Sequence, residues 1–257
     1  MTHPLCRKLL TIAFAMVVTS PSMALADVAE KVSFDAASNP DLKKIAILRI
    51  TPSQKITIKN CNMAIAVGQR VGGLLPALLE AGAEGAKNGV QQGQYLEMMK
   101  AKGITFVPEM LAALEKELSH SGYETVYLDK QRPILMEDKK TLDFSKVQTD
   151  ADAILFVNYG PVGYSSPLLK SSYAPWVVMA ARLVDAHTYK TLYFQSFNVT
   201  QVADKNTSNN LVAILPEEKY LFASFDDLLG KFDLSTEGIV NCETKIAAYL
   251  GNQLKRN

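Results

Sequence analysis

The sequence predicts an α/β (α+β) fold in which a mixed sheet of four to five strands packs against helices. Short β-rich apolar segments alternate with amphipathic helical segments along the chain, a pattern typical of mixed folds. Three of the apolar segments lie close together, at Ala153–Tyr159, Trp176–Asp185 and Thr191–Val199. A short polar turn at Ala186–Lys190 joins the last two, so we expect a hairpin at the centre of the sheet.

The first residues predict export. Arg7 and Lys8 precede the apolar run Leu9–Val18, and Ala24-Leu25-Ala26 has the small-x-small pattern of a cleavage site. This is the pattern of a secretory signal peptide with cleavage near Ala26. The apolar run is shorter than the ~20 residues that span a bilayer. We therefore expect a periplasmic or secreted protein with no transmembrane helix in the mature chain.

Charge and cysteine content limit the classes of partner. The formal net charge is +1, so no basic excess is available to attract nucleic acid or an anionic membrane. Beyond the predicted signal peptide the cysteines are Cys61 and Cys242. An isolated pair usually joins in an oxidising compartment, so we expect a disulfide between them. Two separately buried thiols are the alternative.

The first half of the domain should contain two strands, a helix and a third strand. Leu42–Ile50 is apolar enough for a core strand, and Thr51–Asn60 suits a short strand or an extended arm. Phe106–His120 has the apolar stripe of an amphipathic helix, and Gly122 suits its end. Tyr123–Leu128 follows as a strand.

The second half should contain a long surface loop and two helices. Gln131–Ser145 is polar, with a short helix expected around Phe144–Val147. Gly160–Pro175 is rich in glycine, proline and hydroxyl side chains, which predicts a long loop of the kind that often carries function. Tyr220–Phe232 and Ser235–Lys255 are predicted helices, the latter with Ser235 or Thr236 as its cap.

A segment rich in glycine and alanine, Cys61–Gly93, follows the first two strands. Its glycines recur with the four-residue spacing that lets helix backbones approach closely, at Gly68, Gly72, Gly85, Gly89 and Gly93. We expect broken helices, kinked at Pro76, within an insertion at about 61–103. The alternative is an oligomerisation or membrane-active segment, although charged residues such as Arg70 and Glu84 argue against a membrane span.

The strand sequences resemble a known group of periplasmic domains. SGYETVYLD after an amphipathic helix, then ADAILFVNYG, then VMAARLVDAHTYKTLYFQSF, is similar to the domain shared by the TolB amino-terminal domain, CsgG and LpoB. The similarity covers about Lys43–Leu254 without the insertion. It implies one domain over 27–257, following a signal peptide over 1–26. It also implies a non-catalytic envelope protein that acts through protein–protein contacts.

The sequence departs from this group at two places. Tyr189 stands where the group has a corner glycine, so we do not expect a positive φ there. No cysteine lies directly after the apolar run of the signal peptide, where a lipid-modified cysteine would stand, so the lipid anchor common in this group is not expected.

No recognisable catalytic motif is present. The two histidines after the signal peptide, His120 and His187, lie far apart and supply neither a zinc site nor a catalytic triad. Asp185 is too close in sequence to orient His187 towards a serine such as Ser165, and neither a GxSxG motif nor a P-loop occurs. We therefore expect a protein that is not an enzyme and that holds neither a cofactor nor a metal.

The aromatic residues near the expected loop are the candidate interaction surface. They are Tyr159, Tyr164, Tyr173 and Trp176, and aromatic clusters of this kind are typical of protein interfaces. The alternative is that these rings pack onto the edge of the sheet.

Three functions remain open at this point. The first is an exported accessory or assembly protein that binds another envelope protein or a second copy of itself. The second is a periplasmic protein or enzyme that binds a small molecule or glycan in a cleft under the inserted helices. The third is a membrane-associated oligomer built on Cys61–Gly93, and peripheral membrane contact is compatible with each of them.

Overall fold

The computed structural model describes residues 31–51, 56–60, 74–137, 142–166, 172–200 and 211–256, with side chains of the first long helix described from Lys87 onward. The predicted signal peptide, Cys61, Gly68 and Gly72 lie outside these residues. The helices are α2 (Leu74–Ala101), α3 (Val107–His120), the 3-10 helix η1 (Glu218–Tyr220), α4 (Phe225–Gly230) and α5 (Phe232–Gln253). The strands are β1 (Lys44–Leu48), β2 (Ile56–Asn60), β3 (Glu124–Leu128), β4 (Ile134–Leu135), β5 (Leu142–Asp143), β6 (Ala153–Ser166), β7 (Ala174–Asp185), β8 (Thr191–Val199) and β9 (Leu211–Ile214).

The main sheet has seven strands in the order β3-β1-β6-β7-β8-β9, with β2 also beside β6. β1 and β2 pair in parallel with the two ends of β6, and a bridge between Thr51 and Asn158 lies between them. β6, β7 and β8 are antiparallel to one another. This confirms the predicted α/β (α+β) class and the central hairpin. The sheet is larger than expected because β2 and β9 both join it.

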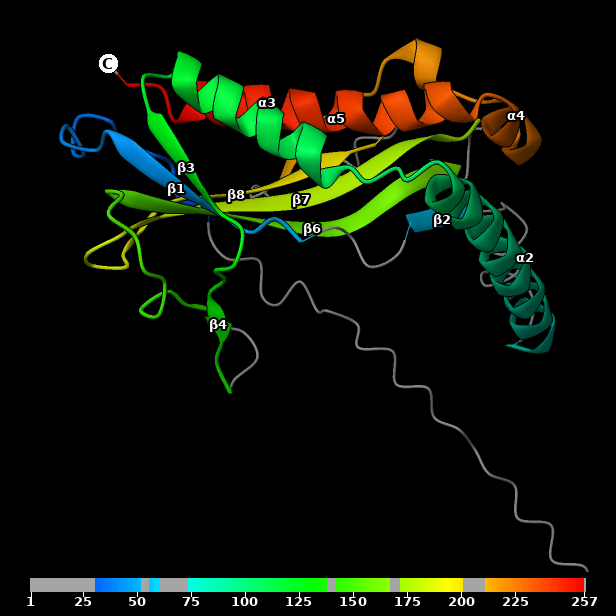
Figure 1. Cartoon of the computed structure of the whole chain (residues 1–257). Coiled ribbons are helices and arrows are strands. Elements are labelled where there is room, and N and C mark those ends of the chain that lie inside the picture. Colours follow the sequence, from blue (N-terminus) through cyan, green and yellow to red (C-terminus); the bar gives the residue numbers. More distant parts are fainter. Residues whose placement is uncertain are drawn as a thin grey trace, which may run out of the picture.

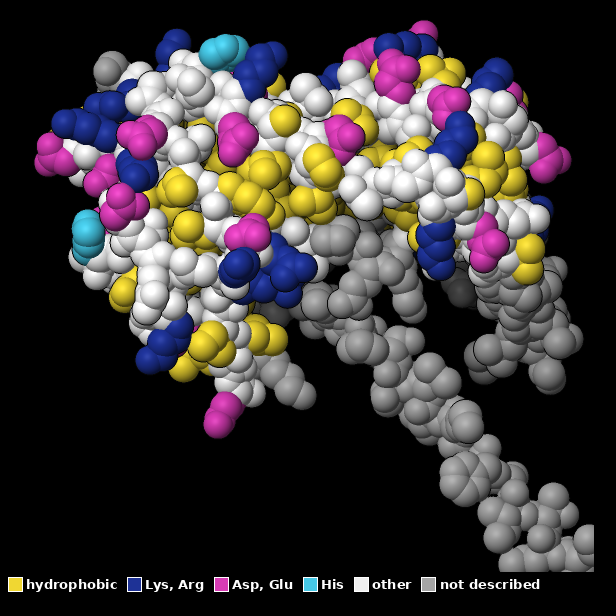
Figure 2. All heavy atoms as spheres, in the orientation of Figure 1, with side chains coloured by type: hydrophobic (Ala, Val, Ile, Leu, Met, Phe, Trp, Pro, Cys, Tyr) yellow, Lys and Arg dark blue, Asp and Glu magenta, His cyan; other side chains and the backbone are white. Residues whose placement is uncertain are grey.

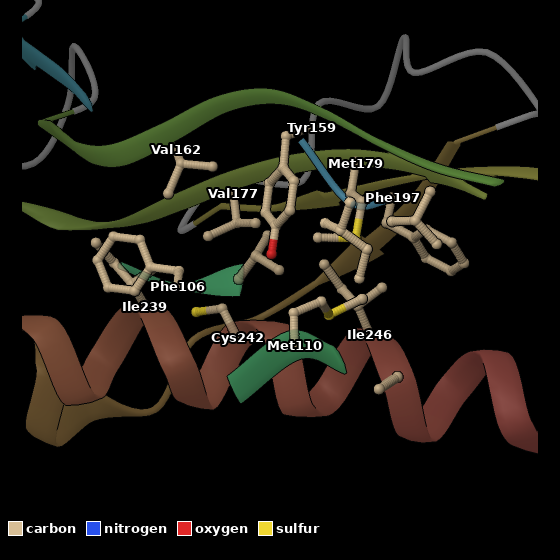
Figure 3. Close-up of a cluster of buried hydrophobic side chains, with 14 of the residues drawn as sticks. Phe106, Met110, Tyr159, Val162, Val177, Met179, Phe197, Ile239, Cys242 and Ile246 are labelled. Atoms are coloured by element: carbon tan, nitrogen blue, oxygen red, sulfur yellow. The ribbon is translucent and has the colours of Figure 1, made fainter. Parts of the chain in front are cut away.

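The helices α3 and α5 lie together over one face of the sheet, and α2 lies at the end near β2 (Figure 1). Alternate residues of β7, such as Val177 and Met179, are buried towards these helices, as a strand with one covered face requires. Figure 3 shows Met110 of α3 and Ile246 of α5 packed beneath Tyr159, Met179 and other sheet residues. The predicted helix at Phe106–His120 is confirmed as α3, and Gly122 after it has a φ of 91°.

The expected loop at Gly160–Pro175 is wrong over most of its length. β6 continues to Ser166 and β7 begins at Ala174. The pairing of β6 with β7 shifts register between Tyr159 and Val162. This irregularity contains Pro161, and a bulge tolerates a residue that lacks an N–H group. Residues 167–171 lie outside the described part of the chain.

Three helix predictions also need correction. The predicted helix Tyr220–Phe232 is divided, because the Ser224 side chain accepts a hydrogen bond from Asp227 N at 3.1 Å and starts the short helix α4 there. α5 begins at Phe232, so Ser235 and Thr236 are not caps but lie inside its first turns. No helix forms around Phe144–Val147, where the chain makes a turn after β5.

Tyr189 has a φ of 57°, so the expectation of a negative φ at this corner is wrong. Asp185 determines the turn: its Oδ1 accepts hydrogen bonds from the backbone N–H groups of His187 and Thr188 at 2.9 and 2.7 Å. The Tyr189 N–H donates to Asp185 O at 2.9 Å, which closes the corner. These bonds hold the tyrosine in a conformation that suits glycine better.

We expect Tyr189→Gly to stabilise the protein by about 0.5–1 kcal/mol, since relief of the left-handed strain exceeds the added chain entropy. Urea unfolding measures the change. Tyr189→Ala is the control, because alanine removes the ring but keeps the strained Cβ. Equal shifts for the two variants would show that the ring, not the backbone, determines the effect.

Candidate functional site

The three tyrosines predicted as interaction residues are buried, so that prediction is wrong for them. Tyr159, Tyr164 and Tyr173 are 8%, 0% and 5% exposed. The Tyr159 and Tyr164 side chains lie on the helix-covered face of β6, where each hydroxyl donates a hydrogen bond to α5, to Glu243 Oε1 at 2.6 Å and to Ser235 O at 2.7 Å. The alternative, rings packed onto the edge of the sheet, does not describe Tyr159 and Tyr164 either, because both are residues of the inner strand β6. Burial and hydrogen bonding of this kind are structural roles.

Trp176 lies on the other face of β7 and is partly exposed. The Lys59 ammonium of β2 lies 5.6 Å from the centre of its ring, close enough for a cation–π contact. Among the four predicted aromatic residues, Trp176 is therefore the one that remains available to solvent.

Cys242 is a free, fully buried thiol, so the predicted disulfide is not present in the structure. Its side chain lies in the core between α5 and the sheet (Figure 3). Burial raises the pKa of the thiol to about 12, which makes it unreactive at neutral pH. Cys61, its predicted partner, lies outside the described residues.

The described part of the glycine-rich segment lies in one continuous helix, α2, which has 28 residues and extends past Gly93, where broken helices were expected. Pro76 is the third residue of α2, within the first turn, where its missing N–H group has no intrahelical partner to lose. A Cβ at Gly89 or Gly93 would meet no heavy atom within 4 Å. These two glycines therefore serve no close helix packing within the described part of this chain. The role of the glycine spacing in oligomerisation stays a prediction.

The most unusual surface feature is a segment that leaves the main sheet between β3 and β6. We call its described residues, 131–137 and 142–148, the appendage. β4 and β5 pair within it as a small antiparallel hairpin. In Figure 1 this hairpin projects from the side of the sheet opposite α3 and α5. The appendage is thus separate from the main hydrophobic core.

The base of the appendage is held by Gln131. The Gln131 side chain donates to Gln148 O at 2.7 Å and accepts from Gln148 N at 2.6 Å. Arg49 N, just after β1, donates to Gln131 O at 3.3 Å. These bonds join the two ends of the appendage to each other and to the sheet.

A small second core holds the base of the appendage against the sheet. Phe144 and Val147 are 3% and 7% exposed and cluster with Leu48, Ile154 and Val184 of the sheet. The ring of Phe144 also meets that of Phe156 edge-on, with 6.2 Å between their centres. The hairpin beyond this core is therefore carried on a rigid base.

The hairpin itself exposes three consecutive large apolar side chains. Ile134, Leu135 and Met136 are 50%, 54% and 49% exposed. We call these three residues the apolar triplet. Successive residues of a strand point to opposite sides, so both sides of β4 are apolar and open. Figure 2 shows hydrophobic side chains on this projection below the body of the molecule.

The neighbourhood of the apolar triplet is polar and carries charges of both signs, including the exposed Asp129. Arg49, Lys130 and Arg132 are exposed and form no ion pair with another described residue. Glu137 is exposed directly after the triplet. On β5, hydrogen bonds from Ser145 lower the pKa of the Asp143 carboxyl. The triplet is thus a contiguous apolar ridge within a charged rim, which is the usual composition of a protein interface.

Sequence reasoning missed the appendage because most of Gln131–Ser145 is polar. The signal that could have identified it is the run Pro133-Ile134-Leu135-Met136 within that polar segment. No group of three or more His, Cys, Asp or Glu residues in the described ranges could hold a metal ion. None of the described helices is long and apolar enough to cross a membrane.

Comparison with known proteins does not assign the chain to a family. No family model matches it, and no curated protein matches it. Among solved structures, a Xanthomonas campestris protein described under the family model DUF330 is 9% identical with a TM-score of 0.37, covering 82% of each chain. A lipoprotein from Neisseria meningitidis is 16% identical with a TM-score of 0.20, covering 63% of this chain and 88% of its own. Likenesses this distant carry no argument about this chain, and its relation to TolB, CsgG and LpoB stays a prediction.

Proposed function

We propose that this chain is an exported, non-catalytic cell-envelope protein that acts by binding another protein, with the appendage as its docking element. The observation that carries the proposal is the exposure of Ile134, Leu135 and Met136 on a hairpin with a fixed base. A contiguous apolar ridge of this kind is unfavourable in water and is typical of interaction sites. The predicted signal peptide supports the location in the envelope.

The apolar triplet is large enough to contribute measurably to binding. Complete burial of one such side chain contributes about 1.5–3 kcal/mol, and roughly half of each is still exposed. Burying the remainder of all three would contribute about 3 kcal/mol, or roughly a hundredfold in affinity. The base of the appendage is already fixed by Gln131 and Phe144, which lowers the entropic cost of binding.

A protein partner fits the triplet better than a membrane does. Glu137 follows Met136 directly, and the sequence linking β4 to β5 continues with Asp138, Lys139 and Lys140. The charges from Asp129 to Lys140 nearly cancel, so the segment has little of the positive charge that draws a hairpin to an anionic membrane surface. A groove in a protein can bury the apolar side chains and leave the charges in solvent or pair them.

We expect a photo-cross-linking amino acid at position 135 to yield one discrete adduct in intact cells. The matched control is position 215, because Leu215 is 62% exposed but lies outside the appendage. Leu135→Ser should reduce the adduct formed from position 134 at least several-fold, whereas Leu215→Ser should leave it unchanged. Mass spectrometry of the adduct identifies the partner.

The possible results separate the alternatives. An adduct with a different envelope protein supports the proposal, and an adduct with a second copy of this chain would replace it by self-association. Cross-linking at position 135 no stronger than at position 215, or cross-linking mainly to lipid, would contradict the proposed docking role.

A further inference from the structure

A carboxyl group lies buried in the middle of the interface between α5 and the sheet. Glu243 of α5 is 0% exposed, and its Oε1 accepts the hydrogen bond from the Tyr159 hydroxyl at 2.6 Å. Its other oxygen, Oε2, has no hydrogen-bond partner among the described residues. Figure 3 shows the Tyr159 hydroxyl directed from the sheet towards α5. The proposed docking function does not use this group.

The carboxyl has no compensating positive charge among the residues that the structure describes. No ion pair involves Glu243 in the described part of the chain, and the core around Tyr159 is apolar. The titratable neighbours are Tyr159 on β6, Cys242 on α5 itself and Glu109 on α3. Burial, followed by the charge of Glu109, raises the pKa of Glu243 to about 8 against the lowering effect of the Tyr159 hydrogen bond. The neutral carboxylic acid is therefore the form that suits the closed interface.

Both ends of α5 are held independently of Glu243. Near the beginning, Tyr164 donates to Ser235 O at 2.7 Å. Near the end, Tyr123 donates to Leu254 O at 2.6 Å and Ser121 Oγ donates to Gly251 O at 2.8 Å. The helix is thus fastened at two ends, with an ionisable and incompletely hydrogen-bonded group between them.

We propose that Glu243 makes the centre of the α5–sheet interface proton-sensitive, so that loss of its proton admits water there while both ends of α5 stay attached. A buried carboxylate with one hydrogen bond is poorly solvated, and hydration of Oε2 requires the packed side chains around it to separate. The opening is local: the central turns of α5 separate from the sheet and their backbone hydrogen bonds open to water, while the helix stays attached at both ends. It goes beyond the proposed docking function and does not depend on it.

The direction of the pH effect follows from linkage. The closed state binds the proton more tightly than an opened state, in which the carboxyl has its ordinary pKa. The stabilisation is therefore complete below the ordinary pKa, is lost as the pH rises towards about 8, and changes no further above that value. Within that window the opening equilibrium should increase about tenfold for each pH unit.

Hydrogen exchange of the wild-type chain, corrected for the intrinsic pH dependence of exchange, tests this proposal. We expect amides in the middle of α5, around Cys242–Ile246, to lose protection about tenfold per unit between roughly pH 5.5 and 7.5. Amides near Ser235 and Leu250 should change much less. Glu243→Gln keeps the size of the side chain without the titration, so its profile should be flat.

Tyr159→Phe supplies a test that a purely structural role would not meet. The Tyr159 hydroxyl stabilises the ionised carboxylate, so its removal should raise the pKa of Glu243. The loss of amide protection should then end at a higher pH than in the wild-type protein. A carbon-13 carboxyl titration of the wild-type protein measures the Glu243 pKa directly, even if a variant fails to fold. An ordinary pKa, or the same exchange profile in wild type and Glu243→Gln, would overturn the proposal.

Discussion

Gly163→Ala is expected to destabilise the protein by about 4 kcal/mol. Gly163 lies on β6 with a φ of 151°, and a Cβ there would lie 2.1 Å from the carbonyl oxygen of Thr57 on β2. The unfavourable backbone conformation costs roughly 1–3 kcal/mol, and the steric overlap with a paired strand costs about as much again. Because the contact atom belongs to the backbone, β2 would have to move away from β6. Urea unfolding monitored by circular dichroism measures the loss.

Gly89→Ala provides the matched control for this substitution. Gly89 lies inside α2, and a Cβ there would meet no heavy atom within 4 Å. Alanine at a helical position should stabilise by up to about 1 kcal/mol. If Gly163→Ala cost less than 1 kcal/mol, the close parallel pairing of Thr57 with Gly163 would be incorrect.

Gly238→Ala is expected to destabilise the protein by about 3 kcal/mol. Gly238 lies on α5, where a Cβ would be 2.6 Å from the Tyr164 hydroxyl oxygen and 3.0 Å from Cγ of Tyr220. The Tyr164 hydroxyl already donates to Ser235 O, so the new methyl group would break a buried hydrogen bond and overpack the interface. Thermal or urea unfolding would detect a loss of this size.

A double substitution identifies the cause of that loss. Tyr164→Phe removes the oxygen that the new Cβ would strike, so the cost of Gly238→Ala should fall by at least 1 kcal/mol in the Tyr164→Phe background. Gly230→Ala is the control within the same region, because a Cβ there meets nothing within 4 Å. Strictly additive effects would show that Gly238 and Tyr164 are not in the contact described.

The central hairpin and α3 were predictable because their signals are local. β8 alternates between partly exposed and buried residues from Leu192 to Val199, and the apolar residues of α3 recur at helical spacing. Neither segment contains a glycine or an internal proline that would predict a loop instead. The confirmed fold class depends largely on these segments.

The second half of β6 was not predictable from local chemistry. Gly160, Pro161 and Gly163 are loop signals in isolation. They lie in a strand because β2 and β7 pair on either side of it, and pairing between distant segments is invisible in one sequence. The same register turns Tyr159 and Tyr164 inward, so the candidate interaction surface was misplaced by the same error.

The appendage was missed for a different reason. The apolar run Ile134–Met136 is too short for any periodicity, and isolated apolar residues in a polar segment usually pack somewhere. Their exposure results from the way Gln131 and Phe144 fasten the base to the sheet and leave the hairpin projecting. Such exposure is a property of the tertiary structure, so the sequence alone could not predict it.

The position of β1 also has a consequence for the order in which the chain can fold. The Asp152 carboxylate accepts hydrogen bonds from the backbone of both Lys43 and Lys44, at 2.8 Å each, across 109 and 108 residues of sequence. Among the described strands β1 pairs with β3 and β6, which both follow it by many residues, so these partners become available only after much of the chain has been synthesised. Closing so long a loop is slow, and proteins rich in distant contacts fold over milliseconds to seconds. Such late closure keeps the nascent chain open during synthesis, which is the state that the export predicted from its first residues would require.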